Sequence, residues 1–280
     1  MATEYGHYTS PGELLGIIRD EFLWATNIKF LNDQHEFQHA LKLIKTILDG
    51  TPPLAGGASF QTLLQVFRDE VSKELGFIDP HTAESVFTIS FSEETDLLSQ
   101  WRGYCPGNNG YCIVFDLEEV HKHMSGKLTS CHLVKCVYDD AVKIAKLKEL
   151  LNSRWQEYTK LRDAKPRKAV IDGFARELTL LDSYFKHPSF NEEQEHRIVV
   201  IDQDEALRKS IEFREGRSSL VPYLKLPVPR KLIKKIVIGP NVDQPLAVRA
   251  LEAFVEKCTG IPSFIGSVEF VTSQTPYRRM

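Results

Sequence analysis

Hydrophobic and polar side chains alternate along residues 194–201 (QEHRIVVI), and a period of two predicts a β-strand. One face of this strand would carry Glu195 and Arg197, and the same alternation continued backwards adds Glu193. A charged strand end with a cross-strand ion pair is one interpretation. The other is a catalytic carboxylate at the mouth of the strand, and the alternation is compatible with both.

Comparable patterns along the rest of the chain indicate an α+β domain. Short apolar or alternating runs predict strands at GHYTS, FLWATNI, VFTISFS, YCIVFD, SCHLVKCVYD, IEFRE, YLKLPV and IKKIVIGP, with a last strand that ends in PYRR. Helical spacing predicts helices at residues 34–48 and 59–76, and at PGELLGIIRDEF, DLLSQWRGY and QPLAVRALEAFVEKCTG. Ser10 and Pro11 are a good N-cap and first residue for the first of the lettered helices.

Residues 139–187 differ from this mixture of strands and short helices. Their pattern is mostly helical, with a break near Pro166, and they carry many lysines and arginines. We expect a helical insertion or flank. Acidic residues are interspersed among the basic ones of residues 143–176, which favours a solvated helix surface over one that tracks a phosphate backbone. The same two interpretations apply to PRKLIKK, residues 229–235.

The composition fits one soluble globular domain that spans residues 1–280. Hydrophobic residues make up 42% and charged residues 26%, both ordinary proportions. The net charge of −3 gives no overall field that would recruit nucleic acid. No apolar run approaches the roughly 18 residues of a membrane-spanning helix, and the start shows no signal-peptide pattern. We therefore expect a cytoplasmic protein with no membrane partner.

Two patterns suggest a metal site, and both fail on geometry. The five cysteines lack paired spacing and indicate free thiols in a reducing compartment. Cys131 and Cys136 in CHLVKC would lie on opposite faces of a strand, so a zinc ligand set stays incomplete. HEFQH, residues 35–39, matches the HExxH zinc-peptidase motif, but helical spacing turns both histidines away from the buried stripe. We expect no metal, and a zinc metallopeptidase is the weakest functional hypothesis.

Six motifs follow one another along the chain in an order that is more specific than any one of them. They are HYTS, LWATNIKFLNDQHEF, SFSEETDLLSQWRGY, GYCIVFD, EEQEHR and a terminal PYR. Together they resemble the bacterial domain of unknown function two-nine-seven-one, whose members look like distant relatives of ADP-ribosyltransferases. The resemblance covers nearly the whole chain and is weakest between Asp139 and Ser189. One departure is Gln34, where the family has proline after Asn-Asp.

The resemblance implies an ADP-ribosyltransferase-like split β core with flanking helices and a helical insertion at about 139–187, which grips NAD. Cleavage of the nicotinamide–ribose bond makes an oxocarbenium-like ribose, which a carboxylate stabilises. Glu195 takes that role by position, and Glu193 matches the residue that orients or deprotonates an acceptor. Arg197 would hold a carboxylate or a pyrophosphate oxygen. His7, with Thr9, matches the residue that binds the adenosine ribose, and the alternative is a strand histidine whose hydrogen bonds are satisfied within the protein.

Other residues of the motifs have two interpretations each. Trp101 and Tyr104 are three apart on a helix and could line a pocket beside nicotinamide with Arg102 on phosphate, or Trp101 could pack in the core and Arg102 lie on the surface. The serines of SFSE could orient the ribose or occupy the polar face of a strand. Residues 32–36 could bind the ribose or form an Asx turn and a helix cap. The expected NAD-binding residues are His7, Tyr8, Thr9, Asn32, Asp33, Glu36, Ser90, Trp101, Arg102, Tyr104 and Arg197.

The resulting functional hypothesis is a mono-ADP-ribosyltransferase that consumes NAD and modifies an unknown macromolecule, either protein or nucleic acid. Some relatives look like toxins or phage-defence effectors, so bacterial conflict is one possible setting. The first alternative is an NAD glycohydrolase, in which water replaces the acceptor. The second is a nucleotide-binding or interaction module that has the fold without turnover.

Overall fold

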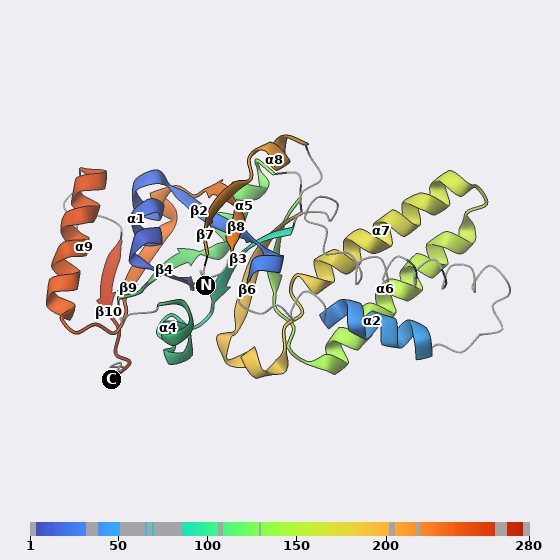
Figure 1. The fold of residues 1–280 in the computed structure, drawn as a ribbon, viewed down its shortest axis with the longest axis horizontal. Coiled ribbons are helices and arrows are strands. Elements are labelled where there is room, and N and C mark those ends of the chain that lie inside the picture. Colours follow the sequence, from blue (N-terminus) through green and yellow to red (C-terminus); the bar gives the residue numbers. More distant parts are fainter. Residues whose placement is uncertain are drawn as a thin grey trace.

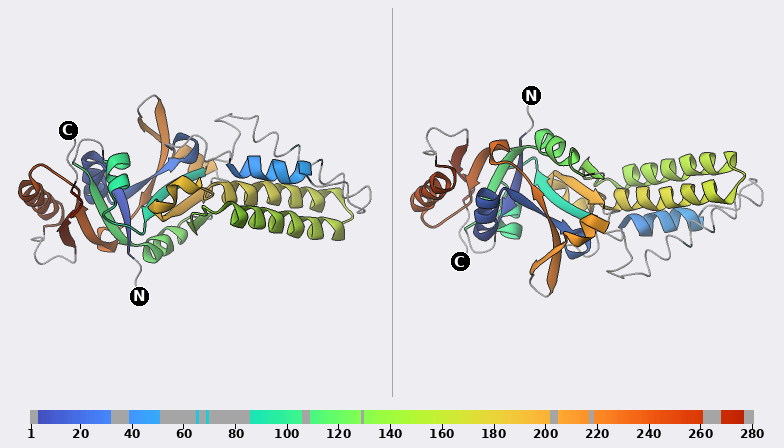
Figure 2. Two further views of the ribbon diagram at one scale, coloured as in Figure 1. Left: turned by 90° about the horizontal axis from the view of Figure 1, so that it is seen from below. Right: turned by 90° about the horizontal axis from the view of Figure 1, so that it is seen from above.

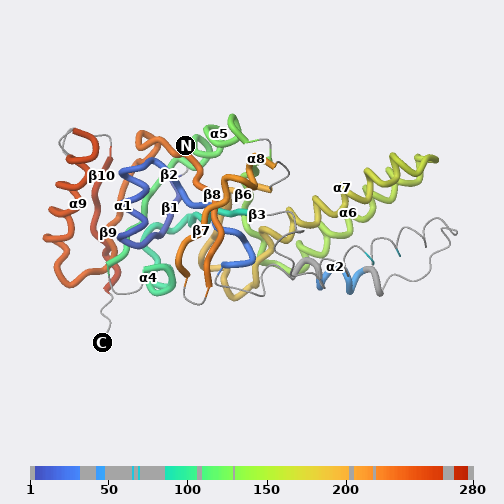
Figure 3. Tube along the Cα trace, turned by 45° about the horizontal axis from the view of Figure 1, so that its top comes forward, coloured from blue at the N-terminus to red at the C-terminus, as the bar shows by residue number. Residues whose placement is uncertain are grey.

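The computed structural model describes residues 4–31, 39–50, 65, 69, 86–105, 109–128, 130–201, 205–216, 219–260 and 268–276. The molecule is elongated, with a twisted β-sheet and its helices on one side and a long helical arm on the other (Figure 1). The arm leaves the end of the sheet that contains β6 (Figure 3).

The described strands form one sheet. They are β1 (Glu4–Thr9), β2 (Phe22–Asn27), β3 (Val86–Ser92), β4 (Tyr111–Asp116), β5 (Cys131–Lys135), β6 (Glu195–Ile201), β7 (Glu212–Glu215), β8 (Leu220–Pro227), β9 (Ile233–Ile238) and β10 (Glu269–Thr272). The main order is β10-β9-β4-β1-β3-β2-β8-β7, and β6 pairs with β3 while β5 pairs with β6. The described pairings are antiparallel except that of β9 with β10. This mixed sheet and its helices confirm the α+β class.

The sheet divides at β3. One edge of β3 pairs with β6 over its whole length, Val86–Ser92. The other edge is shared between two strands, because Ser92 pairs with Gly6 of β1 at one end while Thr88 pairs with Thr26 of β2 near the other. The two halves of the sheet, β10-β9-β4-β1 and β2-β8-β7, therefore diverge from the same edge of β3.

One face of the sheet carries the largest hydrophobic core. Helices α1 (Pro11–Asp20), α5 (Leu117–Ser125) and α9 (Gln244–Thr259) cover it and bury residues such as Ile17, Val120 and Leu251. Helix α1 begins as predicted, with Pro11 in its first turn and a capping box in which Ser10 and Glu13 bond each other's backbone. Short elements η1 (Ile28–Phe30), α8 (Glu205–Lys209) and η4 (Arg230–Leu232) connect the strands.

The opposite face is covered by α4 (Leu98–Tyr104) and, beside it, the 3₁₀ helix η3 (Pro188–Glu193). Tyr8, Trp101, Cys112 and Val237 form a second, smaller cluster there. The two faces follow from the register: Tyr8 lies opposite Cys112 and points to α4, whereas His7 lies opposite Ile113 and points to the face of α1.

The arm is the predicted helical insertion. It consists of α6 (Asp140–Lys160) and α7 (Ala164–Asp182), with α2 (His39–Gly50) packed along them (Figure 2). Its core includes Ile44, Leu147 and Phe174. The helical path is interrupted between α6 and α7, close to Pro166 as predicted. Pro166 lies in the first turn of α7, where its missing backbone N–H costs no hydrogen bond.

One prediction about the opening strand is wrong. β6 begins at Glu195, and Glu193 ends η3. Gln194 between them has φ 41°, in the left-handed region, so the strand alternation stops there and does not extend back to Glu193.

Several expected features lie outside the described residues, namely the helix over residues 59–76 apart from positions 65 and 69, Asn32, Asp33, Glu36 and most of HEFQH. All five cysteines are free. Across the part of the chain that the structure describes, no group of three or more histidines, cysteines and carboxylates could hold a metal ion. None of the described helices is both long and apolar enough to span a membrane.

Candidate functional site

Four charged side chains meet where the arm joins the sheet, and we call Lys186, Glu193, Glu195 and Arg197 the buried charge cluster. Glu195 is 3% exposed, and its Oε1 accepts from Arg197 Nε at 2.6 Å. Its Oε2 accepts from Lys186 Nζ at 2.5 Å and from Arg197 Nη2 at 3.1 Å. Lys186 also donates to Glu193 Oε2 at 2.5 Å. The ion pair predicted from the sequence therefore forms between Glu195 and Arg197, two residues apart on one strand, and not between two strands.

The cluster holds Glu195 in its ionised form. Burial alone would raise the pKa of this carboxyl, but Arg197 and Lys186 outweigh burial and lower its pKa to about 2. The surrounding backbone completes the network, since Arg197 Nη1 donates to the Ser183 carbonyl at 2.8 Å and the Glu195 amide donates to Tyr138 Oη at 2.8 Å. Buried charges are tolerated when they are paired and hydrogen-bonded in this way.

Tyr104 is partly exposed and lies within electrostatic range of the buried charge cluster. It ends α4, and 37% of its surface is exposed. The pKa of its phenol is raised, first by desolvation and then by the Glu195 carboxylate, while Lys186 acts in the opposite direction. These interactions show that the phenol is close enough to the cluster to sense its charges.

Trp101 has the core-packing role that the sequence offered as its alternative. It is 1% exposed, and its indole meets the Tyr8 ring edge-on with the ring centroids 4.7 Å apart. Tyr8 fixes the turn before α4, because its hydroxyl donates to the Glu94 carbonyl and accepts from the Leu97 amide, both at 2.8 Å.

Asp96 fixes Trp101 from its polar side. The Trp101 indole N–H donates to Asp96 Oδ1 at 2.7 Å, and the Gln274 amide donates to Oδ2 at 2.8 Å. The hydroxyls of Ser273 and Thr275 also donate to Oδ1. One carboxylate thus ties α4 to the segment that follows β10.

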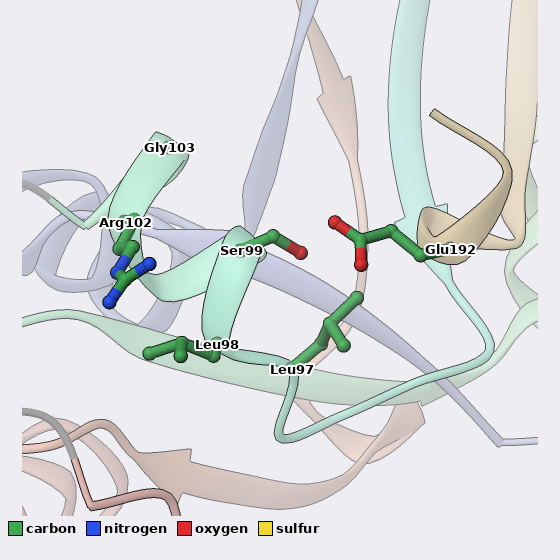
Figure 4. Close-up of a pocket in the computed structure, with 6 residues that line it drawn as sticks. All are labelled: Leu97, Leu98, Ser99, Arg102, Gly103 and Glu192. Atoms are coloured by element: carbon green, nitrogen blue, oxygen red, sulfur yellow. The ribbon is translucent and has the colours of Figure 1, made fainter. Parts of the chain in front are cut away.

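A shallow open depression of about 500 Å3 lies between α4 and η3 and is lined by Leu97, Leu98, Ser99, Arg102, Gly103 and Glu192 (Figure 4). The Glu192 carboxylate and the Ser99 hydroxyl face one another across it, and the Arg102 side chain lies along the same helix (Figure 4). Within the described residues, the buried Ser99 hydroxyl has no hydrogen-bond partner. The depression is thus lined by a cation, a carboxylate and a hydroxyl that is buried without a partner among the described residues.

His7 and Thr9 lie on the other face of the sheet from Glu195. His7 Nδ1 is 2.9 Å from the Ser90 carbonyl oxygen, where β1 leaves β3, and burial lowers the pKa of its imidazole. Thr9 Oγ1 donates to Glu13 Oε2 at 3.0 Å. The structure therefore brings His7 next to β3 without bringing its ring to the buried charge cluster.

The backbone register nevertheless joins the three strands that carry the predicted residues. Ser92 of β3 pairs with Gly6 of β1 on one side and with Glu195 of β6 on the other. Ser90 pairs with Arg197 in the same way. Ser92 also donates its hydroxyl to the Glu193 carbonyl at 2.7 Å and so holds η3 against the strand end.

Residues 100–198 match the family described as protein of unknown function (DUF2971). This match confirms the resemblance to the domain of unknown function over α4, the arm and the start of β6, although the motifs are weakest in the arm. No curated protein and no solved structure matches the chain.

The DUF2971 region contains the whole buried charge cluster and three of the six residues that line the depression. Three contributors were missed at the sequence level: Lys186, Tyr138 and, just outside this region, Asp96. Each makes its contact through tertiary packing, and Asp96 meets Ser273 from 177 positions away. A lone lysine in YFKHP or a lone aspartate in EETDLL carries no spacing signal that would have identified it.

Proposed function

We propose that this chain binds NAD and transfers ADP-ribose from it to a macromolecule, with Glu195 as the carboxylate beside the reacting ribose. The observation that carries the proposal is the register of β1, β3 and β6, which lines up Gly6, Ser92 and Glu195 across three adjacent strands. Ser92 is one of the two serines of SFSE, whereas His7, next to Gly6, faces the other side of the sheet and does not support the site. A sheet that divides at β3 also supports the ADP-ribosyltransferase-like split core.

The chemistry needs a carboxylate that stays ionised at neutral pH, and Glu195 meets that requirement. As the nicotinamide–ribose bond breaks, its electron pair leaves with neutral nicotinamide and positive charge develops on the ribose. A carboxylate beside that ribose stabilises the charge. The acceptor then forms the new bond to the ribose carbon and loses its proton to Glu193, the less buried carboxylate of the cluster and the nearest carboxylate to Glu195 in sequence.

Access to Glu195 requires a side-chain movement. Its side chain is only 4% exposed, and Lys186 occupies one carboxylate oxygen. Lys186 bonds both Glu193 and Glu195, so it can release Glu195 and keep Glu193 as its partner. Arg102 and Ser99, in the depression beside α4, provide a cation and a hydroxyl for the phosphates or the ribose of the substrate.

A second candidate, a nucleotide-binding module without turnover, is favoured by the charge balance of Glu195. Two cations already neutralise this carboxylate, which reduces the negative potential available to an oxocarbenium ion. In this case the depression binds the ligand while the buried charge cluster serves the structure alone.

The test uses a variant that keeps the charge. Glu195→Asp retains the carboxylate and withdraws it by one methylene, so that the cations stay compensated. Purified protein is incubated with NAD, with and without cell extract, and free nicotinamide and labelled macromolecules are measured. We expect Glu195→Asp to lower nicotinamide release at least about 100-fold. Glu118→Asp, at an exposed position of α5 on the other face, should match wild type.

Three outcomes separate the hypotheses. Nicotinamide release without extract indicates glycohydrolase activity, and release only with extract indicates transfer. NAD binding by calorimetry without any release supports the module. Wild-type release by a folded Glu195→Asp variant, or no NAD binding at all, rejects the proposal for this site.

A further inference from the structure

Basic residues gather at the far end of the arm, which we call the arm tip and define as residues 158–168. It joins the end of α6 to the start of α7. Lys160, Arg162, Lys165 and Lys168 are exposed there, with Arg167 half-buried, and Asp163 is the acidic residue of the segment. The arm tip therefore carries more positive charge than the balanced composition of the whole arm predicts.

Elsewhere on the arm, some cations pair with carboxylates, whereas Lys146, Lys148 and Arg176 form no ion pair with any described residue. Arg154 contacts both Glu157 and Glu177. Where α7 leaves the tip, Lys168 pairs with Asp172 at 2.9 Å. These contacts fit the solvated helix surface expected from the sequence.

The tip differs in the density of its cations, since residues 158–168 contain five basic residues and one acidic residue. Lys160, Arg162 and Lys165 form no ion pair with any residue in the part of the chain that the structure describes. Arg167 is fixed in place, since its Nε donates to the Leu161 carbonyl at 3.2 Å and its guanidinium lies 4.8 Å from the centre of the Tyr158 ring. The tip thus presents three cations to solvent beside a fourth that is held in position.

We propose that the arm tip binds the phosphate backbone of a nucleic acid. Lysine and arginine bind phosphates by charge and hydrogen bonding and release counterions as they do so. The exposed large hydrophobic side chains among the described residues lie elsewhere, so the tip offers no apolar anchor for a lipid surface or for the centre of a protein interface. The same lack of exposed aromatic side chains indicates contact with the backbone and not stacking on bases.

The position of the tip suits a long ligand. Helix α6 has 21 residues and is about 30 Å long at about 1.5 Å per residue, so the tip stands well away from the sheet (Figure 2). A duplex seated on the tip and running along α6 would span the length of that helix within about one helical turn. The binding itself does not depend on NAD chemistry.

The experiment measures anisotropy of a fluorescein-labelled 30-base-pair RNA duplex, and of a DNA duplex of the same length, with the full-length protein. The test variant is Lys160→Glu/Arg162→Glu/Lys165→Glu. The matched control, Lys122→Glu/Arg249→Glu/Lys257→Glu, makes the same charge change at exposed positions of α5 and α9. Because the three tip residues have no described ion-pair partners, we expect the test variant to keep the wild-type melting temperature.

We expect the tip variant to bind at least tenfold more weakly, and the control to bind within about twofold of wild type. With three phosphate contacts, the logarithm of the wild-type affinity should fall with the logarithm of salt concentration at a slope near about −3, and the slope should be close to zero for the tip variant. Equal affinity of wild type and tip variant would overturn the proposal. So would an equal loss in the control, or binding to phosphatidylserine vesicles with none to either duplex. No NAD is present, so failure here leaves the proposed function unaffected.

Discussion

The buried charge cluster and the ion pairs on the arm use the same residue types in opposite surroundings. In the cluster, the side chains of Lys186 and Glu195 are each 4% exposed. On the arm, Lys168 and Asp172 are 75% and 46% exposed. The distances hardly distinguish them, at 2.5 Å in the cluster and 2.9 Å on the arm. The difference in burial therefore decides how much each pair affects the free energy of unfolding.

The difference follows from desolvation. Charges in the cluster have exchanged water for one another, so that removal of one leaves its partners buried and uncompensated. Charges on the arm keep most of their water, and removal of one returns its partner to solvent. Fold-determining charges should thus be concentrated at the root of the arm.

The largest effect is expected for Glu195→Gln, which removes one charge from the buried charge cluster. The amide has nearly the same shape but no charge, which leaves Lys186 and Arg197 with an excess of positive charge inside the protein. We expect a loss of about 3–5 kcal/mol in the free energy of unfolding, measured by urea denaturation at pH 7. Glu177→Gln on the arm is the control. A loss under about 1 kcal/mol in Glu195→Gln would show that the cluster is more hydrated than its exposure indicates.

The pH dependence of stability tests the contribution of Glu195 separately. The pKa of Glu195 is about 2 in the folded protein, below its ordinary value of 4.5. Its stabilisation is present above about pH 4.5 and is lost as the pH falls through about 2. The stability gap between wild type and Glu195→Gln should then narrow by about 3 kcal/mol between pH 5 and pH 2. Urea unfolding at each pH tests this, and a gap independent of pH would contradict the depressed pKa.

The smallest effect is expected on the arm. Lys168→Ala removes an exposed pair from α7, and the free energy of unfolding should change by no more than about 0.5 kcal/mol. Asp172→Ala and the double variant complete a double-mutant cycle whose coupling energy should be equally small. A coupling above about 1 kcal/mol would place this surface pair in the same class as the buried one.

Local signals explain what the sequence predicted well. Ser10 and Pro11 started α1 as expected, because a cap and a fixed φ act within one turn. The alternating run VFTISFS became β3 over the same residues. The extension of β6 to Glu193 failed because a left-handed Gln194 has no sequence signature, unlike a glycine at such a position.

The candidate site was less predictable, because its contacts join distant segments. The charges of Glu195 and Arg197 were visible in the pattern, but the burial that gives them meaning depends on Lys186 and the packing of η3. Trp101 was visible as an aromatic residue, while its core role depends on Tyr8 and Asp96. Sequence periodicity gives the face of an element and does not give the partner that covers it.

The two ends of the arm are joined by backbone hydrogen bonds, and this affects how the chain folds. Val137 N donates to the Tyr184 carbonyl at 2.9 Å, and Lys186 N donates to the Val137 carbonyl at 3.0 Å, so the two ends of the insertion lie side by side. Helices form from local contacts within microseconds, and an antiparallel pair that zips up shortens the effective loop between β5 and β6. Strands β5 and β6 are distant in sequence, but they can then pair as quickly as strands joined by a short loop. Arms of different length on this base should fold at similar rates.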